Sequence, residues 1–346
     1  MTCSYALAVL YTRFSVPRDH DTALEWINNA RAIAELEPDP IDASYFQVFQ
    51  DNGLALVAMH RGDLARSLEL VDAGIERLER ELPSDRYVVH RSQLLHNRAR
   101  VLAALGRLDE ADADFGRLTE WDPNYVEYHT DRGNLHRRRG DLDAALACYE
   151  RAVAVSPPLP DMFYNRATIR TQAGLTAGAL EDLDYALEME PGMLNARMAR
   201  AALRLAQDDT PGALEDAQLA LADHVDDAAV HALLAECHEA LGDNHAARAA
   251  FANALELDPD FVPALVNSAV LEHGLGDLDR AIHRLTRALE IKGDDPDILF
   301  NRGFVLRESG DGAAAARDFQ AALRLPGCDR ELVLVQLAGA ETADVD

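Results

Sequence analysis

Lysine is nearly absent from this sequence: of the 33 basic residues, Lys292 is the only lysine. A phosphate-binding loop requires a Gly-Lys-Ser/Thr run, and no such run occurs. Schiff-base chemistry would depend on Lys292, which stands beside Gly and Asp residues typical of a turn. The shortage of lysine therefore argues against nucleotide hydrolysis and against a Schiff-base enzyme.

Cysteines, aromatic residues and long apolar runs are scarce as well. The 4 cysteines are far apart and include no Cys-x-x-Cys pair, which favours a reducing cytoplasm over a zinc site or a disulfide framework. Aromatic residues make up 6% of the chain, so helices rich in Ala and Leu are favoured over a β-sandwich. No apolar run reaches the length of a membrane span, and no signal peptide is recognisable. We expect a cytoplasmic protein, and the preference for Arg and Ala is typical of GC-rich bacterial genomes.

Charge of one sign dominates, because 60 acidic residues give the chain a formal net charge of −27. Such a surface repels nucleic acid phosphates and anionic membranes, so we expect neither as a partner. The 12 histidines form no His-Glu-x-x-His motif, and no Gly-x-Ser-x-Gly elbow or Gly-x-Gly-x-x-Gly turn occurs. The sequence therefore predicts no enzyme, no metal site and no cofactor.

What the sequence does contain is a period of 34 residues. Small residues stand seven positions before and five positions after each turn residue, and mostly bulky residues stand nine after it. Small residues let two antiparallel helices approach closely, and glycine reverses the chain in a left-handed conformation. The period therefore predicts a recurring helical hairpin. Its turn residues are Gly106, Gly140, Gly174, Asp208, Gly242, Gly276 and Gly310.

This pattern resembles the tetratricopeptide repeat, a 34-residue helix-turn-helix with small, aromatic and proline signals at these offsets. The resemblance implies an all-α fold, a right-handed α-solenoid (superhelix) of stacked hairpins. Seven regular units are predicted over 92–329. Two irregular hairpins precede them in 1–91, with extra residues around Pro17. A capping helix at about 331–340 and an acidic tail occupy 330–346.

The resemblance also implies a function, namely a scaffold or adaptor that holds a peptide or helix of a partner protein in its concave groove. An alternative is a sensor or regulatory domain of a larger bacterial regulator or signalling protein. This alternative arises because Met1 falls at the start of a repeat, so an output domain upstream would fit. The identity of the partner is not written in the sequence.

The groove of such a solenoid is lined by the first helix of each hairpin, at positions about thirteen, ten, nine, six and two before the turn. These positions are polar in the first half of the array and apolar in the second. The predicted groove residues are Asn97, Arg100, Asn134, Arg138, Asn165, Met198, Ala202, Leu233, Val266, Asn267, Val270, Asn301 and Phe304.

One column of this groove is rich in asparagine. In some proteins of the resembling family, such as kinesin light chains, inner asparagines bond the backbone of an extended peptide. The column is interrupted here, and asparagine is frequent at this place in the family, so a general structural preference is the other interpretation. The asparagines of the column are Asn97, Asn165, Asn267 and Asn301.

Two further features each have two interpretations. The run His136-Arg137-Arg138-Arg139, together with Arg100, forms a basic cluster that resembles a carboxylate clamp without its lysines. Arg100, Arg137 and Arg138 are the predicted anion-binding residues, and ion pairing with the nearby acids, among them Asp109 and Asp131, is the alternative. The apolar half of the groove fits an amphipathic helix, a hydrophobic peptide, a second copy of this chain or the chain's own C-terminal helix at 331–340. The alternative there is that its alanines are simply good helix formers.

Acidic pairs between the predicted helices, such as Asp208-Asp209 and Asp226-Asp227, are expected to cap the helices that follow. The hairpin that turns at Asp208 departs most from the pattern. It carries Ala217 where other repeats have a bulky residue, so its interface loses apolar contact. The sequence predicts that this hairpin is the least stable.

Overall fold

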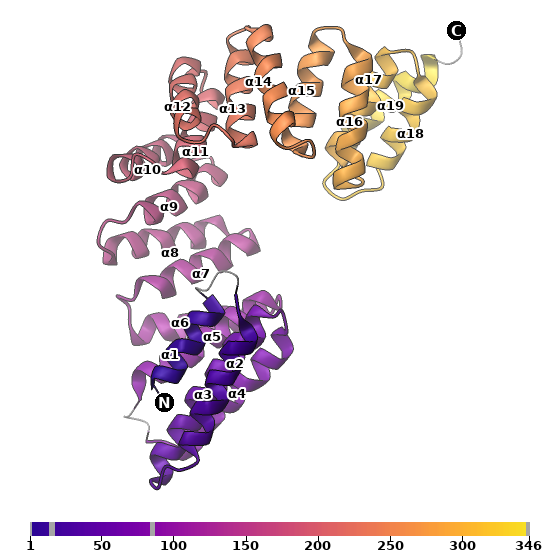
Figure 1. Cartoon of the computed structure of the whole chain (residues 1–346). Coiled ribbons are helices and arrows are strands. Elements are labelled where there is room, and N and C mark those ends of the chain that lie inside the picture. The colour runs from indigo at the N-terminus through magenta and orange to yellow at the C-terminus, as the bar shows by residue number, and fades with distance from the viewer. Residues whose placement is uncertain (1, 14–17, 84–86, 344–346) are drawn as a thin grey trace. The chain divides into compact units, whose positions relative to one another are not determined.

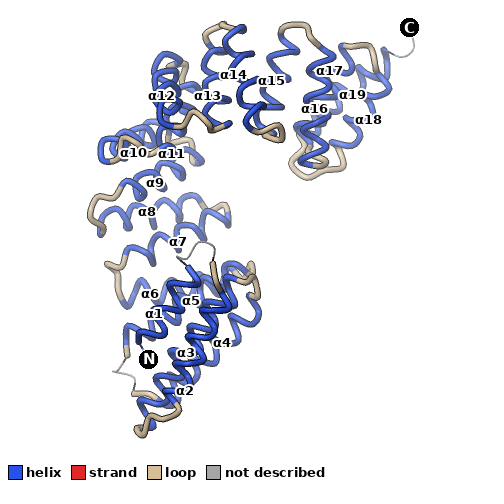
Figure 2. Tube along the Cα trace, in the orientation of Figure 1, coloured by secondary structure: helices blue, strands red, loops and turns tan. Residues whose placement is uncertain are grey.

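A computed structural model of the protein describes residues 2–13, 18–83 and 87–343. These residues form helices joined by short turns and contain no strand (Figure 2). Within each part of the chain, consecutive helices pair as hairpins that stack on one another, as in the predicted α-solenoid (Figure 1). Pro17 and the last residues of the acidic tail, 344–346, lie outside the described residues.

The chain divides into two compact units, Met1–Asp182 and Leu183–Asp346. The first unit contains α1 (Thr2–Arg13), α2 (His20–Ala34), α3 (Pro40–His60), α4 (Leu64–Glu81), α5 (Val88–Ala104), α6 (Leu108–Trp121), α7 (Val126–Arg139), α8 (Leu142–Val155) and α9 (Pro160–Gln172). The boundary falls within α10 (Thr176–Met189). The second unit contains α11 (Leu194–Ala206), α12 (Thr210–Asp223), α13 (Ala228–Ala240), α14 (Asn244–Leu257), α15 (Val262–Gly274), α16 (Leu278–Lys292), α17 (Pro296–Glu308), α18 (Gly312–Ala322) and α19 (Arg330–Ala343).

The hairpins turn where the sequence predicts. The six turn glycines of the regular repeats have φ angles between +73° and +89°, and Asp208 has a φ of +62° at the corresponding place. The second aspartate of each acidic pair caps the next helix: Asp209 accepts a hydrogen bond from the N–H of Gly212, and Asp227 accepts one from Ala229. The predicted capping role of these pairs is confirmed.

The core is a series of small clusters, each shared by one hairpin and the next. Its largest side chains stand nine positions after the turns, where Phe115, Tyr149, Phe251 and Phe319 are fully buried. A Cβ atom on Gly303 would lie 2.9 Å from the ring of Phe319, which explains why small residues recur seven positions before the turn. At the end of the second unit, α19 packs on α18 and covers the last cluster.

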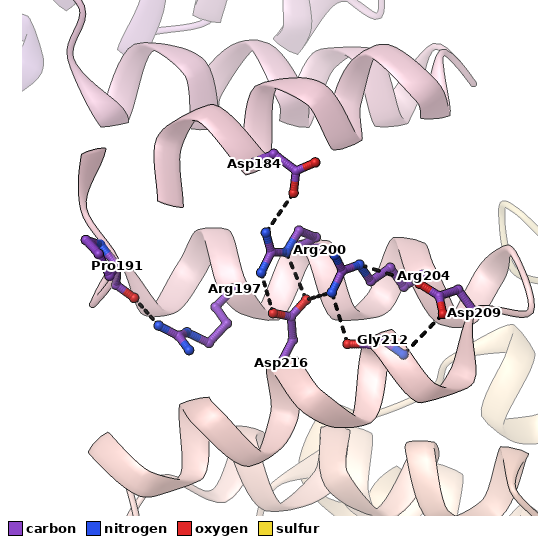
Figure 3. A network of polar contacts seen from close by, with 8 residues as sticks. All are labelled: Asp184, Pro191, Arg197, Arg200, Arg204, Asp209, Gly212 and Asp216. Carbon is purple, nitrogen blue, oxygen red and sulfur yellow. Dashed lines mark hydrogen bonds and ion pairs between the residues drawn. The ribbon is translucent and has the colours of Figure 1, made fainter. Parts of the chain in front are cut away.

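A column of buried ion pairs joins the two helices in four of the seven regular hairpins, and the repeat pattern alone did not predict it. An arginine eight positions before the turn donates two hydrogen bonds to an aspartate eight positions after it. Figure 3 shows one example, in which Arg200 bonds both Asp216 and Asp184, and Arg204 adds a second arginine to Asp216. The pairs are Arg98–Asp114, Arg166–Asp182, Arg200–Asp216 and Arg302–Asp318.

The variant Asp208→Gly should raise the free energy of unfolding by about 1 kcal/mol, because a side chain strains the left-handed conformation and glycine does not. Hydrogen exchange is the appropriate measurement. In the native chain, amides of α11 and α12 should exchange before those of α13 and α14, whose interface contains Phe251. The substitution should reduce this difference. Equal protection of the two hairpins in the native chain would contradict the predicted weak point.

Candidate functional site: the inner face of the first helices

The first helix of each hairpin carries an odd number, and these helices form the inner layer of each unit. In the first unit α3 contacts α5, and α5 contacts α7. In the second unit, contacts join each consecutive pair of odd-numbered helices from α11 to α19. Successive second helices scarcely contact one another in the described part of the chain. The more closely spaced layer is the concave one, so the exposed face of the odd-numbered helices is the inner face.

Part of the polar inner face in the first unit holds neighbouring hairpins together. The Nε2 atom of His96 lies 2.8 Å from Oδ2 of Asp131, and Nε of Arg100 lies 3.7 Å from the same oxygen. The Nδ2 atom of Asn97 donates a hydrogen bond of 2.7 Å to Oδ1 of Asn52. These contacts link α5 to α7 and to α3, so Asn97 and Arg100 are partly engaged within the protein.

A pocket of about 240 Å³ opens on this face between α5 and α7. Asn97 and Arg100 contribute to one wall, and Glu127 contributes to the other. The rings of Tyr125 and Tyr128, whose centroids are 4.4 Å apart, also line it, and burial raises the pKa of both phenols. The pocket therefore combines charges of both signs with aromatic and amide groups.

The predicted basic cluster divides into two parts. Arg139 forms an ion pair of 2.7 Å with Asp109, which is the structural alternative considered above. Arg137 and Arg138 are exposed and form no ion pair with any described residue. Nearby, Asn134 accepts a hydrogen bond of 2.7 Å from the hydroxyl of Tyr149. Two adjacent cations at the end of α7 therefore remain free to meet an anionic group.

The asparagine column is also not uniform. The Nδ2 atom of Asn267 donates a hydrogen bond of 2.5 Å to Oε1 of Glu236, as Asn97 does to Asn52. The amides of Asn165 and Asn301 make no hydrogen bond to another described residue. The structure thus leaves two of the four asparagines fully free to bond a ligand.

The inner face of the second unit is apolar, but one predicted residue does not belong to its surface. Val270 is 49% exposed, and Ala202 is also exposed, with Met198 and Val266 half-buried beside them. Leu233 is only 6% exposed, because it packs in a buried cluster with Ala217 and Cys237. The prediction that Leu233 contributes to an open stripe is therefore wrong.

The apolar face ends at α17 with an aromatic side chain. Phe304 is half-buried, and its ring centroid lies 5.6 Å from that of His273 and 5.0 Å from Cζ of Arg307. The Nε2 atom of His273 lies 2.6 Å from Oε2 of Glu308. Phe304 is therefore held between polar neighbours and does not extend the open apolar surface.

Two glutamates on α13 also belong to this face: Glu236, which the count of six back from Gly242 reaches, and Glu239, which it does not. Glu236 and Glu239 lie one helical turn apart and are partly buried. Burial raises the pKa of both carboxyl groups, and the charge of Glu236 raises that of Glu239 further. Neither forms an ion pair with a described residue. Glu239 could have been found from its place one helical turn after Glu236 on the same helix.

The described residues contain neither a candidate metal site nor a membrane-spanning helix. In the described ranges, no group of three or more His, Cys, Asp or Glu side chains is placed to hold a metal ion. None of the helices described above has both the length and the apolar character needed to cross a membrane.

Comparisons with protein families and with solved structures both found similar proteins. Models of the tetratricopeptide repeat match residues 96–161, 133–204 and 239–299. Comparison with curated proteins found no match to this sequence. Among solved structures, the chain is similar to a tetratricopeptide repeat protein from Parabacteroides merdae, with 20% identity and a TM-score of 0.64 over 72% of this chain and 98% of that one.

Two further structures cover almost the whole chain. One is a monomeric mutant of IFIT1 with m7Gppp-AAAA, at 16% identity and a TM-score of 0.60 over 99% of this chain and 82% of that one. The other is the Cut9–Hcn1 hetero-tetramer of the APC/C, at 14% identity and a TM-score of 0.57 over 97% of this chain and 62% of that one. Identities this low establish similarity of fold alone.

Proposed function

Because this chain is a tetratricopeptide-repeat protein, we propose that it is an interaction scaffold that holds a segment of a partner protein against the inner face of its first helices. The observation that best supports this proposal lies in the first unit. Arg137, Arg138 and Asn165 present cations and an amide on or beside this face without partners in the described chain. Polar groups left free on a concave surface are suited to binding and not to holding the fold together.

The chemistry of this face fits an extended peptide that carries an acidic group. An extended backbone has unpaired N–H and C=O groups, and side-chain amides such as that of Asn165 can bond them. Arg137 and Arg138 can then bind a carboxylate, either of an acidic side chain or of a C-terminus. Arg100 contributes less, because it already lies 3.7 Å from Asp131.

Replacing both Arg137 and Arg138 by Ala should weaken binding of an acidic extended peptide about tenfold and flatten its salt dependence, since two charge contacts are lost. The measurement is fluorescence anisotropy with a labelled Glu-rich peptide at several salt concentrations. The matched control is Arg317→Ala with Arg324→Ala, which removes two exposed arginines at α18. An equal loss of affinity in both double variants would show that binding depends only on the net charge of the protein. Normal binding combined with earlier melting would show that Arg137 and Arg138 are structural.

A further inference from the structure

Buried carboxylates in this protein are compensated by arginine almost wherever they occur. The aspartates eight positions after the turns each bond an arginine, as Asp216 does with Arg200 and Arg204. On α15, Glu272 is fully buried and lies within ion-pair distance of three arginines. Compensation is expected because an unpaired charge in apolar surroundings destabilises a fold.

Glu236 and Glu239 are the exception on the inner face of the second unit. Both are partly buried, and no cation of the described chain pairs with either of them. Glu236 accepts one hydrogen bond, from Asn267, which is neutral. The raised pKa of each carboxyl group shows that its surroundings disfavour the negative charge. The two glutamates therefore leave a negative charge that a ligand's cation would neutralise.

The surroundings of these glutamates decide what kind of ligand fits. Ala202 and Val270 are exposed on the neighbouring helices, and Val266 is half-buried. An extended peptide would leave backbone N–H and C=O groups unbonded over this apolar surface, because Asn267 is already engaged. A helix satisfies its own backbone and presents only side chains. The inner face of the second unit thus suits a helix, in contrast to the amide-rich face of the first unit.

We propose that the inner face of α11, α13 and α15 docks an amphipathic helix of a partner protein, with apolar side chains over Ala202 and Val270 and a lysine or arginine between Glu236 and Glu239. This inference rests on the proposed scaffold function and specifies the class of partner for one unit. Charge complementarity supports a basic partner helix for two reasons. The two glutamates lack a cation within the protein, and the net charge of −27 attracts a basic segment.

The test uses the full chain and a fluorescently labelled amphipathic helical peptide of Leu and Lys. Replacing Glu236 and Glu239 by Gln should weaken binding at least about tenfold, because the lysine loses a partly desolvated partner. Replacing Glu215 and Glu256 by Gln removes the same charge from exposed positions on second helices and should have little effect. The Glu236→Gln/Glu239→Gln variant should melt at the same temperature as the native chain or higher, since an unfavourable charge is removed.

Three results would overturn the choice of a basic helix. Equal weakening in the two double variants would show that the peptide responds to net charge alone. A lower melting temperature of the Glu236→Gln/Glu239→Gln variant would show that these glutamates stabilise the fold instead. A peptide with Glu in place of Lys should not bind, and binding by it would contradict the charge argument directly.

A third variant separates this inference from the proposed function. Val270→Asn adds a polar group to the apolar surface without changing its charge, and it should also weaken binding of the Leu/Lys peptide about tenfold. If Val270→Asn weakens binding and the double glutamine variant does not, the face binds a helix but the glutamates do not select a cation. If neither has an effect, the helix does not dock here, and the scaffold function then depends on the acidic-peptide test in the first unit.

Discussion

Replacing Arg302 by Met should lower the free energy of unfolding by about 3 kcal/mol, because Asp318 would remain buried without its charge partner. Arg302 donates hydrogen bonds of 2.7 Å from Nε and 2.8 Å from Nη2 to the two oxygens of Asp318, which is 7% exposed. Methionine occupies similar space but offers no donor. The pair joins α17 to α18, so the loss should appear as weaker protection of these helices in hydrogen exchange.

A matched control and a double variant separate charge from packing in this experiment. Arg317 is exposed on α18, and Arg317→Met should change stability by no more than about 0.5 kcal/mol. Adding Asp318→Asn to Arg302→Met should recover much of the loss, because the buried carboxylate is then neutral. If the double variant is as unstable as Arg302→Met, the pair acts through shape and not through charge.

The variant Glu272→Gln should also destabilise the protein, again by about 3 kcal/mol, since it leaves buried arginine without a counter-charge. Glu272 is fully buried, and its Oε1 lies 3.3 Å from Nη1 of Arg280 and 3.4 Å from Nη1 of Arg284. Arg248 bonds both of its oxygens. Burial lowers the pKa of Arg284, so its surroundings disfavour a positive charge that Glu272 offsets.

Chemical denaturation followed by circular dichroism is the measurement for Glu272→Gln. The exposed substitution Asp279→Asn in the same hairpin serves as the control and should leave the midpoint nearly unchanged. The additional variant Glu272→Gln/Arg284→Met should be more stable than Glu272→Gln, because the buried charge that lacks a partner is gone. Tolerance of Glu272→Gln would mean that water or rearranged side chains compensate the three arginines.

Arg302 and Glu272 illustrate which buried ion pairs can be predicted from positions in the repeat and which cannot. In four of the seven regular hairpins the arginine precedes the turn and the aspartate follows it, as in Arg302 and Asp318. In the hairpin of α15 and α16 these positions hold Ser268 and Arg284. The cation has moved to the second helix, and the structure supplies its carboxylate from Glu272. Only the three-dimensional arrangement shows that Glu272 replaces the aspartate of the column. One of its arginines, Arg248, comes from the preceding hairpin, so no offset within one repeat relates the two residues.

The residues of the candidate site, like the ion pairs, could be predicted from the sequence only in part. Counting back from each turn places Val270, Ala202 and Arg138 correctly on exposed surface. The same count fails for Leu233, because this side chain packs in a buried cluster with Ala217 of the preceding hairpin. It also cannot tell that Asn97 is bonded to Asn52 while Asn165 is free. Side-chain pairing across hairpins depends on distances that no offset within one repeat specifies.

By itself, the sequence determined the helical hairpin, its turns, its caps and the fold family, because these depend on residues close together in the chain and repeat every 34 positions. The tertiary structure decided which polar groups are used up within the protein and which remain free. Arg139 is paired and Arg138 is not, and Glu272 is compensated while Glu236 is not. The reason is physical: the cost of a charge depends on its burial and on cations from neighbouring helices, and both are set only when the hairpins stack.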